Sequence, residues 1–386
     1  MNLLDKNNNT AILIAGIIAL TVGIGIARFA FTSLLPYMLN DFLTLTTTGI
    51  MASINFLGYL SGAIFSVFLK DLNQKIFYFR IGMLLCVVTT LVLSLSENET
   101  IWLLSRVVAG FGSAMALIVG SSIVMMKLDF KDKTKAMGIH FSGIGISILT
   151  TDLISKLVIH FNSTWRDAWM VLAFFGLIIT LYSLYILSID KEQKQTVLEH
   201  KFDKSIFSFF VIILVLTYFT EGVGFVVQAT FLPDIINSIK GLEGLGEYTW
   251  TLVGIAAIPS TIILMRLAHK HGSINIIILA MLLQVVGILI PTFTSNLYLN
   301  LFSGILYGGT FAGLVSLFMN LGGKIAPHNP VILMASFTAA YGIGQVFAPL
   351  YSVALVEYSG NYNLALYLTA TIVFLGLMLL FFNRKR

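Results

Sequence analysis

Charged residues are scarce in this sequence. They make up 11% of its 386 residues, whereas 57% are hydrophobic. Soluble domains carry about 25% charged residues. A chain with so few charges cannot cover the surface of a water-soluble globule, so the composition excludes that class and indicates an integral membrane protein.

Cysteine and the common catalytic signatures are also lacking. The single cysteine, Cys86, lies in an apolar run, which excludes a disulfide framework and a metal-thiolate site. The sequence has no P-loop, no HExxH motif, no cluster of metal ligands and no Ser/His/Asp arrangement that we can place. We therefore expect no metal, no cofactor, no enzyme activity and no ATP-driven pumping. The glycine-rich run YGGTFAG (307–313) indicates close helix contacts instead of a phosphate cradle.

Long apolar runs are what the sequence has in abundance. Each is about 20 residues long, the length that a helix needs to cross a bilayer, whereas barrel strands are about half as long and alternate. The fold class is therefore an all-α integral membrane protein. We interpret the first run as a retained helix, because it has no small-residue cleavage pattern after a short core. The twelve predicted transmembrane helices are residues 11–38, 46–69, 77–96, 101–126, 135–159, 167–189, 205–233, 248–268, 273–294, 298–322, 331–357 and 362–383.

The longest charged connection lies between the sixth and seventh spans. It reads DKEQKQTVLEHKFDK and covers residues 190–204. We predict that it is a cytoplasmic linker between an N-terminal six-helix bundle (1–189) and a C-terminal six-helix bundle (205–386).

The two predicted halves share a short sequence pattern. The first span contains GIGIARFAFTSLLP (23–36) and the seventh contains GVGFVVQATFLP (222–233). Both have G-x-G, a threonine and then Leu-Pro, although the second is two residues shorter. Parallel repeats of six helices are a known transporter plan, so the pattern favours two pseudo-symmetric bundles. The alternative is a chance similarity between glycine-rich membrane helices.

Lysine and arginine predict the orientation. If the N-terminus is cytoplasmic, the outer loops keep only Arg166 and Lys240, and the other loop and tail lysines and arginines lie inside. Positive residues favour the cytoplasmic side. We therefore expect a multi-pass protein of the cytoplasmic (inner) membrane with both termini cytoplasmic. The basic residues behind the formal net charge of +5 then set the orientation of the protein in the membrane. We expect the protein to contact the lipid bilayer and not nucleic acid.

Several motifs resemble those of one transporter superfamily. LLSRVVAGFGSAMAL (103–117) has an arginine followed by a close-packing glycine run, STWRDAWMVLAFFG (163–176) precedes the sixth span, and GIHFSGIGISI (138–148) is a glycine-rich fifth-span motif. Together they resemble the major facilitator superfamily (MFS). Within it, ARFAFTSLLPYM (27–38) and AAYGIGQVFAPLYSVAL (339–355) resemble the YbfB/YjiJ group. The loop between the second and third spans departs from the usual pattern, because it lacks the glycine and the double arginine.

The resemblance implies the MFS fold, a transport cycle and a central cavity lined by the first and seventh spans. Helical spacing places Thr21, Gly25, Arg28 and Thr32 on one face of the first span, because they are four, three and four residues apart. In the seventh span, Thr217, Glu221, Gly224 and Gln228 repeat that spacing. We therefore expect Arg28 and Glu221 to face the same water-filled space from opposite halves.

Arg28 is the only charge in its span, and a buried guanidinium needs water or a partner. We predict that it binds a negative charge of the substrate; the alternative is an internal salt bridge that locks helices together. Other spans add neutral hydrogen-bonding groups that can contact a substrate. The predicted substrate-binding residues are Arg28, Thr32, Asn55, Tyr59, Glu221, Gln228, Tyr341 and Gln345.

Three residues are candidates for proton coupling: Glu221, Asp152 and His140. Burial disfavours the charged form of a carboxyl group, so Glu221 can exchange protons; the alternative is a neutral glutamic acid bonded between helices. His140 titrates near neutral pH, or it is a satisfied buried histidine. We expect Arg106 and Asp152 to form a structural charge pair, with Lys156 one turn beyond Asp152.

These inferences predict a secondary active transporter that moves a small organic anion by alternating access, coupled to protons, as a monomer. One alternative is an exporter of drugs or metabolites by proton antiport, in which Glu221 meets a cation and Arg28 is structural. Another is a transporter-like membrane sensor without net flux, which would usually carry an appended soluble domain. The loops of this chain are too short for such a domain.

Overall fold

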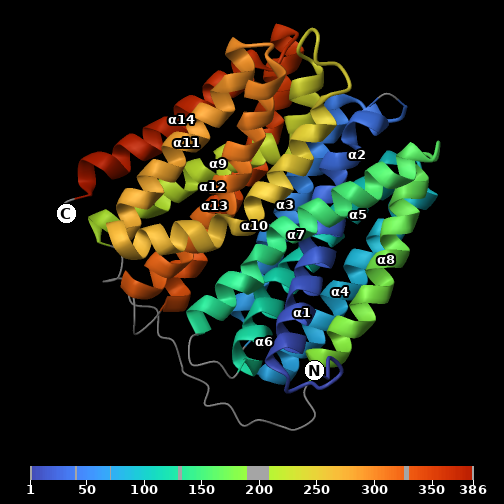
Figure 1. The fold of residues 1–386 in the computed structure, drawn as a ribbon, viewed down its shortest axis with the longest axis vertical. Helices are drawn as coiled ribbons and strands as arrows, with labels where there is room; N and C mark the ends of the chain where they lie inside the picture. The colour runs from blue at the N-terminus through green and yellow to red at the C-terminus, as the bar shows by residue number, and fades with distance from the viewer. Residues whose placement is uncertain are drawn as a thin grey trace.

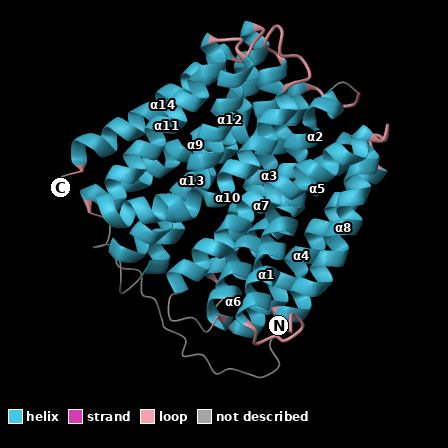
Figure 2. Ribbon diagram, viewed as in Figure 1, coloured by secondary structure: helices cyan, strands magenta, loops and turns pink. Residues whose placement is uncertain are grey.

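The computed structural model describes residues 2–39, 41–69, 71–128, 133–188, 208–325 and 330–384, and within these ranges it contains helices and no strands (Figures 1 and 2). Twelve stretches are long and apolar enough to cross a membrane, which confirms the predicted number of spans. In a bilayer, only structures that satisfy every backbone polar group internally can span, which is why hydrophobic runs alone predict this fold.

The N-terminal half contains the first six spans. The first is continuous over α1 (Asn9–Leu20), η1 (Thr21–Phe29) and α2 (Ala30–Leu39), and the fourth over α5 (Glu99–Ala114), η2 (Met115–Val119) and α6 (Gly120–Lys127). The remaining spans are α3 (Leu45–Val67), α4 (Leu72–Leu95), α7 (Lys133–His160) and α8 (Trp165–Ile186).

The C-terminal half contains the other six. They are α9 (Phe209–Asn237), α10 (Gly246–His271), α11 (Ser273–Phe293), α12 (Leu297–Ile325), α13 (Pro330–Ser359) and α14 (Asn363–Asn383). Figure 1 shows the two halves side by side, blue to green and yellow to red, with the N-terminus at the lower end. The predicted linker 190–204 lies outside the described residues, so its boundaries stay a prediction.

Several helices begin at a side chain that caps the backbone. The Asp71 side chain accepts a hydrogen bond from the Asn73 backbone, and Thr164 and Asp167 form a reciprocal capping box. Such caps satisfy the free N–H groups of the first turn. The third span therefore begins at Leu72, earlier than the predicted residue 77, because the cap starts the helix before its apolar run.

Glycines bring some helices into backbone contact. A Cβ atom on Gly110 would lie 2.0 Å from the Asn55 carbonyl oxygen, so α3 and α5 touch without side chains between them. A Cβ atom on Gly308 would lie 2.3 Å from the Val253 carbonyl oxygen. This contact of α12 with α10 confirms the close helix packing predicted for residues 307–313.

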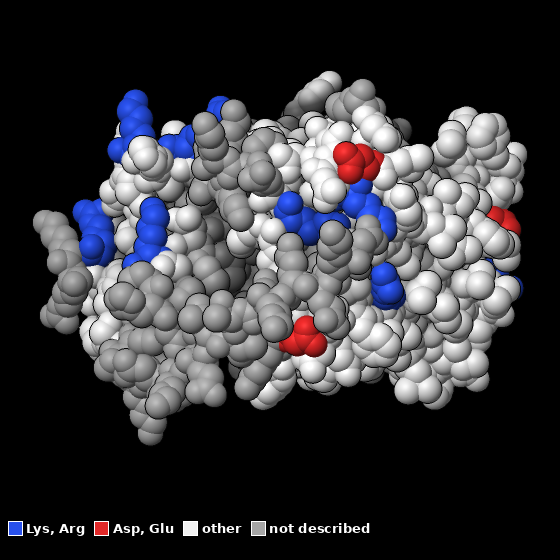
Figure 3. Space-filling model, turned by 90° about the horizontal axis from the view of Figure 1, so that it is seen from below, with Lys and Arg blue, Asp and Glu red and all other residues white. Residues whose placement is uncertain are grey.

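The halves meet through α7 and α10, α3 and α13, and α2 and α9. Among the described residues, the side-chain hydrogen bonds between the halves lie toward the upper end of Figure 1, where α2 ends and α10 begins. They join Thr32 to Ala229, Tyr37 to Glu247, Thr46 to Glu357, Lys156 to Glu247 and Thr251, and Asp152 to Thr251. This upper end is the one predicted to be extracellular. Seen from below, the surface is hollowed between regions that carry lysine and arginine (Figure 3). The two halves are thus held together at the upper end.

Candidate functional site

Arg28 lies in η1, a nine-residue π-helical segment over Thr21–Phe29. A π-helix bonds residue i to i+5 and is frequent at functional sites. Its wider turn changes the direction of successive side chains, so the predicted common face holds only in part: Arg28 and Thr32 line one pocket, whereas Gly25 faces α7. Gly25 packs against Ser147 of α7, Arg28 points to α3 and Thr32 bonds to α9.

Aromatic rings surround the Arg28 guanidinium. Its Cζ atom lies 4.1 Å from the ring centroid of Phe56, 4.8 Å from that of Tyr59 and 5.7 Å from that of Phe225. The residue is 7% exposed, and Nε and Nη2 are buried without a hydrogen-bond partner among the described residues.

No carboxylate in the described part of the chain forms an ion pair with Arg28. A cation–π contact contributes about 0.5–2 kcal/mol, while burying an ion costs several kcal/mol. The rings therefore offset only part of the cost of burial, and the guanidinium is available to an anion.

Arg28 lines a small pocket between the two halves, which we call the inter-half pocket. The N-terminal half supplies most of the lining and α9 supplies the rest; the residues are Arg28, Phe29, Phe31, Thr32, Ala52, Phe56, Arg106, Ala229 and Thr230. The Thr32 hydroxyl donates to the Ala229 carbonyl oxygen across the boundary. A molecule bound here would contact both halves at once.

The structure does not bring Glu221 to Arg28. On the predicted polar face of α9, the Thr217 hydroxyl lies 3.3 Å from the Gly376 carbonyl oxygen of α14. A Cβ atom on Gly224 would lie 2.4 Å from a methyl group of Val373, also on α14. This face therefore packs inside the C-terminal half, because helical spacing shows which residues share a face but not which neighbour that face meets.

Glu221 is fully buried, and neither of its carboxyl oxygens has a hydrogen-bond partner among the described residues. Gln284 of α11 is its polar neighbour. Gln228, two turns further along α9, is also buried, with both amide atoms unpartnered within the described chain. Both predicted residues are thus buried polar groups of α9 without a hydrogen-bond partner among the described residues.

The remaining predicted substrate-binding residues, Tyr341, Asn55 and Gln345, have different surroundings. Tyr341 stacks on Tyr218 at 4.6 Å and lies 5.6 Å from Phe225, next to the Arg28 site. Asn55 donates from Nδ2 to the Arg106 carbonyl oxygen at 2.8 Å, which fixes α3 to α5. Gln345 is buried with Oε1 unpartnered among the described residues. Of these three, only Tyr341 joins the rings around Arg28.

The structure corrects the predicted pair of Arg106 with Asp152. Arg106 donates from Nη1 to the Ala27 carbonyl oxygen at 2.9 Å. Asp152 instead pairs with Lys156 at 2.7 Å, one turn along α7. The prediction matched the two residues by depth in the membrane, but their helices direct the side chains to different neighbours.

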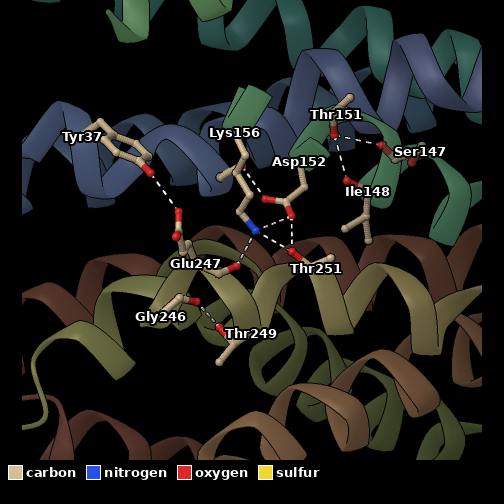
Figure 4. Close-up of polar contacts among 11 residues, drawn as sticks. Tyr37, Ser147, Ile148, Thr151, Asp152, Lys156, Gly246, Glu247, Thr249 and Thr251 are labelled. Atoms are coloured by element: carbon tan, nitrogen blue, oxygen red, sulfur yellow. Dashed lines mark hydrogen bonds and ion pairs between the residues drawn. The ribbon is translucent and has the colours of Figure 1, made fainter. Parts of the chain in front are cut away.

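Asp152 belongs to what we call the upper polar cluster, which joins the halves (Figure 4). Lys156 Nζ donates to Asp152, to the Glu247 carbonyl oxygen at 2.7 Å and to the Thr251 hydroxyl at 2.5 Å. The Thr251 hydroxyl donates to Asp152 at 2.6 Å, as does the Ser33 hydroxyl of α2. The Tyr37 hydroxyl completes the cluster by donating to Glu247 at 2.9 Å.

His140 lies away from both sites. Its Nε2 atom is 2.8 Å from the Ser121 hydroxyl, inside the N-terminal half. No group of His, Cys, Asp and Glu in the described ranges could hold a metal ion.

Sequence analysis missed the aromatic residues of the site. Phe56 and Phe225 lie over Arg28, and Tyr307 donates its hydroxyl hydrogen to the Phe225 carbonyl oxygen at 3.1 Å. The available signal was an aromatic residue beside close-packing glycines, as at Phe225 after Gly224 and Tyr307 before Gly308. Glycines that draw backbones together leave such a ring as the side chain that fills the adjacent space.

Comparison with known proteins identifies the family and the fold of the chain. Residues 20–381 match the family described as uncharacterised MFS-type transporter YbfB. The chain is 23% identical to YtbD of Bacillus subtilis, an uncharacterised MFS-type transporter, over 350 residues that cover 88% of this chain and 87% of the relative. It is 30% identical to the multidrug efflux pump SdrM of Staphylococcus aureus over 141 residues, which are 36% of this chain but only 31% of the relative.

A solved structure with the same fold is that of the nucleoside transporter NupG. The TM-score is 0.77 at 12% identity, over 96% of this chain and 99% of that chain. The likeness therefore concerns the fold alone. Both the matching family and the matching fold are those of transporters, not of enzymes. The chain belongs to the YbfB-type family of the major facilitator superfamily.

Proposed function

We propose that this transporter moves a small organic anion across the cytoplasmic membrane by alternating access, coupled to protons and acting as a monomer. The observation that carries the proposal is Arg28: a buried guanidinium with unpartnered nitrogens that lines a pocket between the two halves. A carboxylate or phosphate oxygen would satisfy those nitrogens with charge-assisted hydrogen bonds. Because the lining comes from both halves, such an anion would favour the conformations in which they close around it.

Asp152 is the carboxyl group that we assign to proton coupling. It holds Lys156 and Thr251 in the upper polar cluster, so its charge supports the contact between α7 and α10. A proton on Asp152 would remove the counter-charge of Lys156 and weaken that contact. Glu221 and His140 are bonded or packed within one half, where protonation has no direct effect on the opposite half.

A second candidate function is export of drugs or metabolites by proton antiport. The partial similarity to SdrM, a multidrug efflux pump, favours it, and the aromatic lining would suit an apolar substrate. A cationic substrate would need a carboxylate in the pocket, and none of the described lining residues is acidic. The anion proposal therefore has more support.

The proposal is tested with purified protein and a panel of carboxylates and phosphate esters in a thermal-shift assay. A ligand that binds the folded state raises its apparent stability. We expect one or more anions to raise the melting temperature of the wild type and none to do so for Arg28→Ala. Arg28→Lys should restore binding only in part, because an ammonium group cannot form the planar two-pronged contact of a guanidinium.

The matched control is Arg80→Ala, which removes an exposed arginine and should leave ligand binding unchanged. Size-exclusion chromatography shows whether each variant is folded and monodisperse. Normal anion binding by Arg28→Ala would rule out the anion site, and stabilisation of the wild type by organic cations alone would favour the exporter.

A further inference from the structure

Arg106 of α5 is a second arginine in the inter-half pocket, and the structure gives it no counter-ion among the described residues. It is 2% exposed, and its Nε atom is buried without a hydrogen-bond partner in the described chain. Its Cζ atom lies 4.6 Å from the ring centroid of Phe31. Like Arg28, it is a buried cation with donor capacity left over.

The two arginines belong to one local structure. Arg106 Nη1 donates to the carbonyl oxygen of Ala27, the residue just before Arg28. Both guanidinium groups line the same pocket and are close enough for their charges to repel. Like charges in a low-dielectric environment destabilise each other unless negative charge is placed between or beside them.

Among the described residues, no side chain supplies that negative charge. The described residues that line the pocket are apolar apart from the two arginines and two threonines. Asp152 is already bonded to Lys156, and Glu221 packs toward Gln284 of α11. Two positive charges thus meet at a pocket without an acidic residue.

The pocket has a volume of about 10 Å³ in the present conformation, so a substrate needs the two halves to move apart before it can enter. We infer that the site then takes a substrate with two negative charges, one for Arg28 and one for Arg106. This inference rests on the proposed function, because it specifies the class of anion. Small dicarboxylates and phosphate monoesters share this chemistry: each presents several anionic oxygens to two guanidinium groups. Arg28 anchors either a monoanion or a dianion, whereas Arg106 selects the dianion.

The test measures affinities of the purified full-length protein by titration calorimetry with four probes of similar size. Succinate and ethyl phosphate carry two charges, butyrate carries one, and butyramide carries none. Charge-assisted hydrogen bonds to a second arginine should make succinate or ethyl phosphate bind at least about tenfold more tightly than butyrate. The ratio of the affinities for succinate and ethyl phosphate shows whether the pocket prefers dicarboxylates or phosphate monoesters.

Two variants then separate binding from structural support. Arg106→Gln should reduce the preference for the dianion to about one while keeping the affinity for butyrate, whereas Arg28→Gln should lose both. An arginine that served only to hold η1 would lower both affinities by the same factor, and this result would overturn the inference. Arg80→Gln, an exposed arginine, is the charge-matched control and should leave the ratio unchanged.

If Arg106→Gln fails to fold, the affinities of the wild-type protein for the four probes still test the role of Arg106. Equal affinities for butyrate and both dianions would overturn the role of Arg106 and leave the anion site at Arg28 intact. If none of the three anions binds more tightly than butyramide, the proposed function fails together with the inference.

Discussion

Lys156 and Asp152 lie one turn apart on α7, and a distance of 2.7 Å between Nζ and Oδ2 makes them an ion pair that faces the other half of the molecule. Their partners Glu247 and Thr251 both come from the first part of α10. The ion pair therefore does two things: it neutralises charge inside the membrane and joins the halves at the upper end.

The first prediction concerns this ion pair. Removing one partner of a buried pair leaves an uncompensated charge and costs about 3–5 kcal/mol. Since Lys156 is 20% exposed, we expect Asp152→Asn to lose about 3 kcal/mol of stability and to lose accumulation driven by a pH gradient in proteoliposomes. Exchange of anion across the membrane without a gradient should continue.

The double variant Asp152→Asn with Lys156→Met should regain most of the stability, because it removes both charges, but not the accumulation. Glu243→Gln, which changes an exposed carboxylate in the loop before α10, is the control. Undiminished accumulation in Asp152→Asn would exclude Asp152 as the coupling group.

The second prediction uses the contact between α3 and α13 at the upper end. A Cβ atom on Gly49 would lie 3.3 Å from the Cβ atom of Val353, close to the separation of about 3.5–4.5 Å found in disulfides. On a Cys86→Ser background, the pair Gly49→Cys and Val353→Cys should form a disulfide under mild oxidation. The bond should stop transport, and a reducing agent should restore it.

The Val353→Cys single variant serves as the control and should keep transporting under oxidation, whereas Gly49→Cys alone is unsuitable because its Cβ atom would lie 2.6 Å from a methyl group of Val353. Full activity of the cross-linked double variant would mean that α3 and α13 need not separate during the cycle.

The third prediction separates Glu221 from Asp152. Because Glu221 packs toward Gln284 within the C-terminal half, we expect Glu221→Gln to keep anion binding and pH-driven accumulation within about twofold of the wild type. Glutamine preserves the shape and hydrogen-bonding capacity of the side chain, so the fold should persist. Loss of accumulation with retained exchange would transfer the coupling role from Asp152 to Glu221.

The fourth prediction concerns orientation. A single cysteine at position 195, made as Gln195→Cys on a Cys86→Ser background, should react with an impermeant reagent only after the cells are opened. The asymmetry of lysine and arginine between the loops motivates this expectation. Labelling in intact cells would place this connection outside and reverse the predicted topology.

The number and approximate limits of the spans were predictable because hydrophobic length is set by the bilayer and by the need to satisfy the backbone. The neighbours of Arg28 were predictable only in part. Tyr59 and Tyr341 lie at or beside the guanidinium as expected. Phe56 carries no sequence signal that separates it from ordinary apolar residues, and for Phe225 the only signal was the adjacent Gly224.

The direction of the polar face of the seventh span was the main failure. In a membrane helix, the side that meets lipid and the side that meets other helices are both apolar, so a few polar residues do not identify the neighbour. The face of Glu221 therefore pointed to α11 and α14 instead of the pocket. For the same reason, the partner of Asp152 was a lysine on its own helix and not Arg106.

The π-helical segment η1 also bears on how the site could diverge among relatives. It lies in the part of the first span that is two residues longer than the matching part of the seventh, so the wider turns accommodate extra residues within an unbroken helix. Each residue of an α-helix turns the chain by about 100°. Because the wider turns of η1 hold the extra residues, deleting one of them would return this stretch toward α-helical turns and redirect Arg28 while α2 keeps its position against α9, which would give an evolving transporter a new pocket lining in a single step.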